Sequence, residues 1–233
     1  MNNLDINWVF DVDGTLTPSR LRIKPEFEEF FLNWMKDKKV YLVTGSDADK
    51  TKEQVGEKIW KGVTKAFQSC GNQIYKNGTI EFENQWVPSS ELIDYLNQLL
   101  KLSQCPEKTS NHIESRVGLL NFSPVGRNCT QDQRESYNEW DNDSRERLKF
   151  AKLIEESFPD LEASVGGQIS IDIHPRGANK SQVRDLIQGP IWFFGDKTGP
   201  GGNDRPLADA LYESDRLFPV NNPEDTHQLL KKL

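Results

Sequence analysis

Two aspartates, Asp11 and Asp13, directly follow the apolar residues Trp-Val-Phe and precede a glycine and two threonines. An apolar run that stops at polar residues is typical of a buried strand ending in a loop. Residues 191–195, Ile-Trp-Phe-Phe-Gly, form a second such run, and it ends in Asp196. If both strands belong to one sheet, the three carboxylates meet at one edge, where they would repel one another unless a hard cation such as Mg²⁺ lay between them.

This spacing indicates phosphoryl-transfer chemistry. A carboxylate beside Mg²⁺ can attack phosphorus and form an aspartyl-phosphate, and a second carboxylate two residues on can carry the proton of the alcohol. The ordinary alternative is that strand-end aspartates cap helices or turns. The sequence favours the catalytic interpretation, with Asp11 and Asp13 as catalytic residues and Asp11, Asp13 and Asp196 as the metal site.

The elements that would position these residues alternate along the chain. Residues 25–34 carry Phe and Trp at helical spacing after a proline, residues 40–43 are a short apolar strand, and residues 50–60 have a helical pattern. Strand, helix, strand and helix predict a parallel sheet wrapped by helices, as in a Rossmann-like α/β fold. Ligands of such sheets bind beyond the carboxyl ends of the strands, where Thr44 and Ser46 also fall.

The middle of the chain does not continue the alternation of strands and helices, which predicts an inserted domain. A hairpin at residues 73–82 turns at Asn-Gly, and a helix, a strand pair, two further helices and an alternating strand follow it before the apolar run at 191–195. We therefore expect an α/β core at residues 1–83 and 180–233, with an α+β cap domain at residues 84–179. In the strand at 168–174 the isoleucines would face the cap's core and leave His174 on the opposite face.

The composition and net charge of the chain indicate which kinds of molecule the protein could bind. The chain has 233 residues, a formal net charge of −7 and three widely spaced cysteines, with no secretory or membrane-spanning pattern. This predicts a soluble, cytoplasmic protein without a nucleic-acid or membrane partner. Anion binding would then depend on local arginines such as Arg116, Arg127 and Arg134, because guanidinium forks match phosphate. Isolated arginines are otherwise usually surface charges.

The motif Asp-x-Asp-Gly-Thr after an apolar strand resembles the haloacid dehalogenase-like superfamily. Five stretches in order are similar, more closely, to the eukaryotic-type phosphomannomutases: residues 10–20 (FDVDGTLTPSR), 45–56 (GSDADKTKEQVG), 121–129 (NFSPVGRNC), 165–172 (VGGQISID) and 193–204 (FFGDKTGPGGND), with PEDT at 223–226.

The resemblance implies roles for particular residues. Asp11 would be the nucleophile and Asp13 the general acid and base, and the Asp11 side chain, the Asp13 carbonyl and Asp196 would hold Mg²⁺. Thr44 or Ser46 would contact the phosphoryl group, although Thr44-Gly45-Ser46 could instead only cap a helix. Lys180 would neutralise the phosphate. The implied sugar-phosphate site comprises Arg20, Arg116, Arg127, Arg134, Ser170 and Asp172.

The predicted function is interconversion of mannose 6-phosphate and mannose 1-phosphate, primed by a hexose 1,6-bisphosphate, in a homodimer joined through the cap. The alternatives are a Mg²⁺-dependent sugar-phosphate phosphatase and an inactive sugar-phosphate-binding regulator. No residue separates mannose from glucose. The family's second, monovalent cation site is in doubt because residues 205–210 depart from the family pattern, and His174 is expected to be partly exposed.

Overall fold

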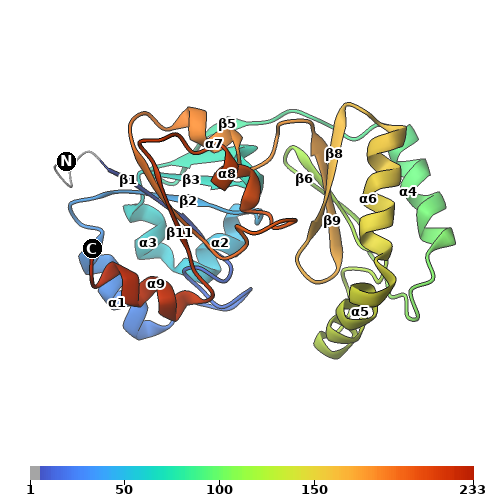
Figure 1. The fold of residues 1–233 in the computed structure, drawn as a ribbon, viewed down its shortest axis with the longest axis horizontal. Coiled ribbons are helices and arrows are strands. Elements are labelled where there is room, and N and C mark those ends of the chain that lie inside the picture. The colour runs from blue at the N-terminus through green and yellow to red at the C-terminus, as the bar shows by residue number, and fades with distance from the viewer. Residues whose placement is uncertain (1–5) are drawn as a thin grey trace. The chain divides into compact units, whose positions relative to one another are not determined.

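The computed structural model describes residues 6–233, which form two compact units (Figure 1). The core unit contains the chain up to Asn84 together with Ala178–Leu233, and the inserted unit is Gln85–Gly177. No helix among the described residues is long and apolar enough to cross a membrane.

A seven-stranded sheet is the centre of the core unit, in the order β11-β10-β1-β2-β3-β4-β5. The first five strands of that order are parallel, and β4 and β5 form an antiparallel hairpin at one edge. The strands are β1 (Asn7–Asp11), β2 (Lys39–Val43), β3 (Lys65–Gln68), β4 (Gln73–Lys76), β5 (Thr79–Glu83), β10 (Ile191–Gly195) and β11 (Arg216–Pro219).

Helices cover both faces of this sheet, so the core unit has three layers (Figure 1). Trp8 and Phe10 of β1 pack into the cluster formed with α1, α2, α3 and α9, whereas Val9 packs on the opposite side with residues of α7 and α8. Because β1 is buried on both faces, it is apolar at consecutive positions. The helices are α1 (Pro25–Trp34), α2 (Ala48–Val55), α3 (Glu57–Gly62), α7 (Gln182–Leu186), α8 (Arg205–Asp209) and α9 (Pro223–Leu230).

The inserted unit is an antiparallel sheet with helices on one face. Its strand order is β6-β7-β9-β8, and α4 and α6 cover the face that carries Leu120, Phe122, Ile171 and Ile173. The alternation of β9 thereby places Ser170, Asp172 and His174 on the other face. The elements are α4 (Ser90–Leu102), β6 (Ile113–Arg116), β7 (Leu119–Phe122), α5 (Gln131–Ser144), α6 (Glu146–Ser157), β8 (Leu161–Gly166) and β9 (Ser170–Pro175).

The structure confirms the predicted α/β fold and differs from the sequence prediction in local detail. The helix expected at residues 50–60 is interrupted at Gly56, whose φ of 80° ends α2 and begins α3. Strand β8 and helix α8 were not predicted. Strand β3 ends at Gln68 and is followed by a short 3₁₀ turn, Ser69–Gly71.

Candidate active site

Asp11 is the last residue of β1, and its carboxylate is buried at the carboxyl edge of the sheet. The chain then turns at Gly14, where φ is 83°. A Cβ atom at this position would lie 2.4 Å from Asp196 Oδ2, so only glycine allows the loop after β1 to approach the end of β10 this closely. The two strand ends are therefore brought together as the sequence predicts.

Three carboxylates gather at this edge. Oxygen atoms of Asp11, Asp196 and Asp204 all lie within 4.8 Å of one another. Asp204 was not assigned a role from the sequence, although it closes the motif at residues 193–204. It returns to the cluster because Lys197 N donates a hydrogen bond to Asp204 Oδ2 across the loop, at 3.0 Å.

Lys180 lies against the carboxylates and is completely buried. Its Nζ donates hydrogen bonds to Asp11 Oδ1 at 2.5 Å and to Asp204 Oδ1 at 2.7 Å. Burial alone lowers the pKa of Lys180, but the charges of Asp11 and Asp204 raise it above its ordinary value. Lys180 is therefore an ammonium ion in direct contact with the predicted nucleophile.

The single positive charge of Lys180 does not balance the three carboxylates of Asp11, Asp196 and Asp204. Burial raises the pKa of Asp11 well above its ordinary value, and the Asp204 carboxylate adds to this rise against the opposing effect of Lys180. Burial and Asp204 also raise the pKa of Asp196. Three hard oxygen donors around one buried ammonium fit a divalent cation such as Mg²⁺.

The Asp13 carboxylate lies outside this cluster of three. Asp13 Oδ1 accepts hydrogen bonds from Gln54 Nε2 at 2.9 Å and from the backbone N of Arg20 at 2.7 Å, and Asp13 Oδ2 accepts one from Ser46 Oγ at 3.5 Å. Gln54 is buried in α2 and also donates to Thr17 Oγ1 at 3.0 Å. These contacts hold the carboxylate in a fixed orientation, and Gln54 is a further residue that the sequence prediction missed inside a quoted motif.

Thr44 and Ser46 follow β2 and therefore reach the same edge of the sheet. Ser46 N donates a hydrogen bond to Thr44 Oγ1 at 3.1 Å, so the buried Thr44 hydroxyl is partly engaged by its own loop. The cap of α2 is instead Asp47, whose side chain accepts a hydrogen bond from Lys50 N. The ordinary alternative, in which Thr44 or Ser46 caps this helix, is therefore wrong.

The helix-free face of the inserted unit carries a second cluster, made of two of the predicted arginines. Arg116 and Arg127 share Glu114, whose carboxylate is 2.7 Å from Arg116 Nη2 and 3.3 Å from Arg127 Nε. Arg127 Nη1 also donates to Ser170 Oγ at 3.0 Å. Burial raises the pKa of Glu114, but the two arginines hold it below its ordinary value. Glu114 thus orients both guanidinium groups.

Arg134 differs from these two arginines. It lies in the first turns of α5, which begins with a capping box formed by Thr130 and Gln133, and only 7% of its surface is exposed. Among the described residues, no carboxylate lies within 4 Å of its guanidinium group. Burial lowers the pKa of Arg134, and the nearby Arg127 adds to this despite the opposing effect of Cys129. A buried, uncompensated cation beside a second cation is suited to an anion.

The same face orients Asp172 and buries His174. Asn121 Nδ2 donates to Asp172 Oδ1 at 2.6 Å, and a Cβ atom on Gly166 would lie 2.4 Å from Asp172 Oδ2. The predicted partial exposure of His174 is wrong, because only 3% of this residue is exposed. Its Nδ1 is 3.0 Å from the carbonyl oxygen of Pro175 and 3.7 Å from Glu162 Oε2 on the adjacent strand.

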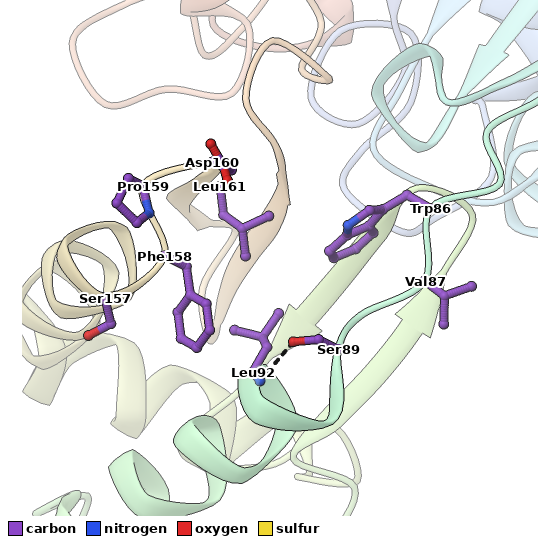
Figure 2. A pocket seen from close by; sticks show the side chains of 9 residues that line it. All are labelled: Trp86, Val87, Ser89, Leu92, Ser157, Phe158, Pro159, Asp160 and Leu161. Carbon is purple, nitrogen blue, oxygen red and sulfur yellow. Dashed lines mark hydrogen bonds between the residues drawn. The ribbon is translucent and has the colours of Figure 1, made fainter.

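A pocket elsewhere in the inserted unit has a different character. It lies between the start of α4 and the connection from α6 to β8, and Figure 2 shows Trp86, Leu92, Phe158 and Leu161 among its lining side chains. The lining contains none of the predicted site residues. The pocket therefore shares no lining residue with either group of predicted site residues, the sheet edge around Asp11 or the arginine-bearing face.

A parallel sheet with this acidic edge, interrupted by an antiparallel sheet unit, is the fold of haloacid dehalogenase-like proteins. Solved structures agree on the fold. A Candida albicans trehalose-6-phosphate phosphatase domain has a TM-score of 0.63 at 15% identity, over 99% of this chain and 92% of its own. A haloacid dehalogenase-like hydrolase from Bacteroides thetaiotaomicron has a TM-score of 0.57 at 12% identity, over 98% of each chain.

Sequence comparison identifies the family within this class. The family described as eukaryotic phosphomannomutase matches residues 27–233. A phosphomannomutase of Dendrobium officinale is 37% identical over 96% of this chain and 92% of its own length. One from Encephalitozoon cuniculi is 34% identical over 97% of this chain and 94% of its own. The chain therefore belongs to the eukaryotic phosphomannomutase family.

Proposed function

We propose that this protein interconverts mannose 6-phosphate and mannose 1-phosphate through a hexose 1,6-bisphosphate. The main support for this proposal is that the guanidinium group of Arg134 is buried without an acidic partner among the described residues. Arg134 belongs to the inserted unit, whereas Asp11 belongs to the core unit. A phosphatase needs one phosphate site. A mutase must also hold the phosphate that is not being transferred, and the arginines provide such a second site.

The proposed reaction passes phosphoryl groups between Asp11 and the sugar. An Asp11 carboxylate oxygen attacks phosphorus of the bisphosphate, the bond from phosphorus to the sugar oxygen breaks, and Asp13 gives that oxygen a proton. That monophosphate leaves, and the free hydroxyl of a substrate monophosphate loses a proton to Asp13 and attacks phosphorus of the aspartyl-phosphate, so that the bond from phosphorus to Asp11 breaks and a bisphosphate forms. The bisphosphate then reverses its orientation, Asp11 attacks phosphorus of its other phosphate, and Asp13 returns the proton to the sugar oxygen that leaves. The isomeric monophosphate is released, the aspartyl-phosphate is restored, and there is no net proton change.

The remaining core residues bind and neutralise the group in transit. Lys180 is in contact with Asp11 and would offset the charge of the phosphoryl oxygens. Thr44 or Ser46 would donate a hydroxyl hydrogen bond to the same group. Asp11, Asp196, the Asp13 carbonyl and, in addition to the sequence prediction, Asp204 would hold Mg²⁺. When bound, Mg²⁺ offsets negative charge on the phosphoryl oxygens.

The waiting end of the sugar phosphate would be bound by the inserted unit. We assign this role to Arg116, Arg127 and Arg134, with Ser170 and Asp172 as partners of the sugar phosphate and Arg20 as a further contributor from the core unit. Binding energy from the non-reacting phosphate can position the sugar and keep water from the aspartyl-phosphate. This would favour transfer to sugar over hydrolysis.

An assay with mannose 1-phosphate, Mg²⁺ and a trace of hexose 1,6-bisphosphate tests the function. Mannose 6-phosphate should be the main product, and its formation should depend on the bisphosphate. Free phosphate as the main product would instead identify a phosphatase, and neither product would identify a binding protein. Turnover of glucose 1-phosphate under the same conditions measures the sugar preference.

Asp204→Asn provides a test of the proposed Mg²⁺ site. Loss of one charged oxygen donor should weaken Mg²⁺ binding by about 10- to 100-fold, the range seen when a group supporting a metal site is changed. Isothermal titration calorimetry measures this without relying on turnover. The matched control is Asp209→Asn, because Asp209 is exposed in α8 and paired with Arg205. Equal Mg²⁺ affinity in both variants would remove Asp204 from the site.

The family resemblance also supports a homodimer formed through the inserted unit and a cytoplasmic location, and we propose both. We further propose that the protein has no nucleic-acid or membrane partner. Sedimentation at several protein concentrations would test the dimer. A monomer at micromolar concentration would reject it.

A further inference from the structure

The turn after β3 has an unusual backbone. Ser69, Cys70 and Gly71 have φ values of 47°, 61° and 96°, so three successive residues are left-handed. This region costs roughly 1–2 kcal/mol for each residue other than glycine. Such a conformation persists only when its surroundings hold it in place, and it often marks a functional segment.

The surroundings of this turn include the loop after β2. Ser69 N donates a hydrogen bond to the Ser46 carbonyl oxygen at 3.0 Å, and Cys70 N donates to the Thr44 carbonyl oxygen at 2.8 Å. The turn therefore supports the loop that carries the predicted phosphoryl-contacting hydroxyl groups.

Asn72 extends this support to the place where the chain re-enters the core unit. It is completely buried, and its Nδ2 donates to the Ser69 carbonyl oxygen at 2.7 Å and to the Ala178 carbonyl oxygen at 2.9 Å. Its Oδ1 accepts a hydrogen bond from Asn84 Nδ2 at 2.8 Å. Asn84 ends the first segment of the core unit and Ala178 begins the second. The Asn72 side chain is thus hydrogen-bonded to the last residue of the first core segment and to the first residue of the second.

Lys180 lies two residues beyond Ala178 and is held from the other side as well. Gln182 Nε2 donates to the Cys70 carbonyl oxygen at 2.9 Å, and Gly71 packs so closely that an added Cβ would lie 3.1 Å from Gln182 Cγ. Asn72 and the turn therefore contact residues on both sides of Lys180, at the Ala178 carbonyl and the Gln182 side chain, and Lys180 Nζ contacts Asp11.

We propose that Asn72 is a positioning residue for the phosphoryl-transfer site. By holding Ala178 and the Ser69–Gly71 turn, it sets Lys180 against Asp11 and supports the Thr44–Ser46 loop. This inference rests on the proposed mutase function, and it assigns Asn72 no contact with substrate. Loss of this support would shift Lys180 relative to the phosphoryl group, which lowers turnover and leaves the aspartyl-phosphate more open to water.

The test compares Asn72→Ala with Asn7→Ala. Asn7 is a similarly buried asparagine whose Nδ2 also donates to two distant carbonyls, those of Gln188 and Pro190, at the opposite end of β1. Both variants should have lowered melting temperatures, because both lose buried hydrogen bonds. Only Asn72→Ala should lower kcat, by about tenfold with KM nearly unchanged, and raise the amount of free phosphate released per mutase turnover.

Equal kcat and equal phosphate release in the two variants would overturn the proposal. If Asn72→Ala does not fold, Gln182→Ala decides, because it removes the hydrogen bond to Cys70 and the packing against Gly71 while Asn72 stays in place, and Gln182 is only half-buried. This variant should also show a lowered kcat and a raised release of free phosphate, both to a smaller extent. Wild-type values of both quantities would contradict the proposal. Wild-type protein without mutase activity would instead reject the underlying function.

Discussion

Asp11→Asn is expected to abolish mutase activity, with kcat falling by about 10⁴-fold or more, as when the nucleophile of another covalent mechanism is removed. The amide has nearly the same shape but cannot form a stable bond to the phosphoryl group. Wild-type protein incubated with hexose 1,6-bisphosphate and quenched in acid should gain one phosphoryl group by intact mass, and the variant should gain none.

Folding should be little affected by this substitution. The Asp11 carboxylate is buried beside Asp204 and Asp196, and its raised pKa shows that this environment disfavours its charged form. The neutral amide relieves that repulsion but gives up the ion pair with Lys180. The melting temperature without metal should therefore stay within about 4 °C of wild type, which corresponds to roughly 1 kcal/mol for a chain of this size. A phosphorylated, active variant would show that another residue is the nucleophile.

The acidic edge of the core sheet was predictable because the sequence signals for it are local. A strand buried on both faces is continuously apolar, so the local sequence showed where β1 and β10 end. It thereby also identified Asp11 and Asp196, which lie at those strand ends. The parallel arrangement followed from the alternation of strands and helices. The arginines were found from their residue type, whereas their shared partner Glu114 depends on the pairing of β6 with β7.

Residues that depend on tertiary contacts were missed. Asp204 lies in a glycine-rich loop, and its return to Asp196 depends on close packing at Gly202, where an added Cβ would lie 2.0 Å from the Lys197 carbonyl oxygen. Alternation placed His174 on the polar face of its strand, but the adjacent strand contributes Glu162, and the residue is buried rather than partly exposed. Neighbouring strands, which sequence spacing does not describe, determine such burial.

Two errors in secondary structure have the same origin. A single glycine within a helical pattern is usually tolerated, so Gly56 did not predict a break. Its positive φ directs the chain from α2 into α3, beside Arg22 and Glu28. Strand β8 has a weak pattern of its own and is defined by six residue pairs with β9. Tertiary contacts override local propensity in both cases, side-chain packing at Gly56 and strand pairing at β8.

Arg134→Ala should lower mutase turnover by about 100-fold, since removing one partner of a buried charge pair costs roughly 2–5 kcal/mol. Arg116 and Arg127 are neutralised in part by Glu114, whereas the buried Arg134 has no carboxylate nearby among the residues that the structure describes. Its charge would be compensated by the substrate's phosphate. Arg134→Lys should recover only part of the activity, because an ammonium cannot reproduce the guanidinium fork.

Three further measurements separate phosphate binding from a structural role for Arg134. Mg²⁺ affinity and phosphoenzyme formation from acetyl phosphate, which carries a single phosphate, should match wild type in Arg134→Ala. The rise in melting temperature produced by mannose 1-phosphate should be lost, because ligand binding stabilises only the protein that retains the site. Arg176→Ala is the control, since Arg176 is an exposed arginine of the same unit bonded to backbone carbonyls. Normal turnover together with a normal thermal shift in Arg134→Ala would exclude Arg134 from the sugar-phosphate site and leave the mutase proposal without its principal support.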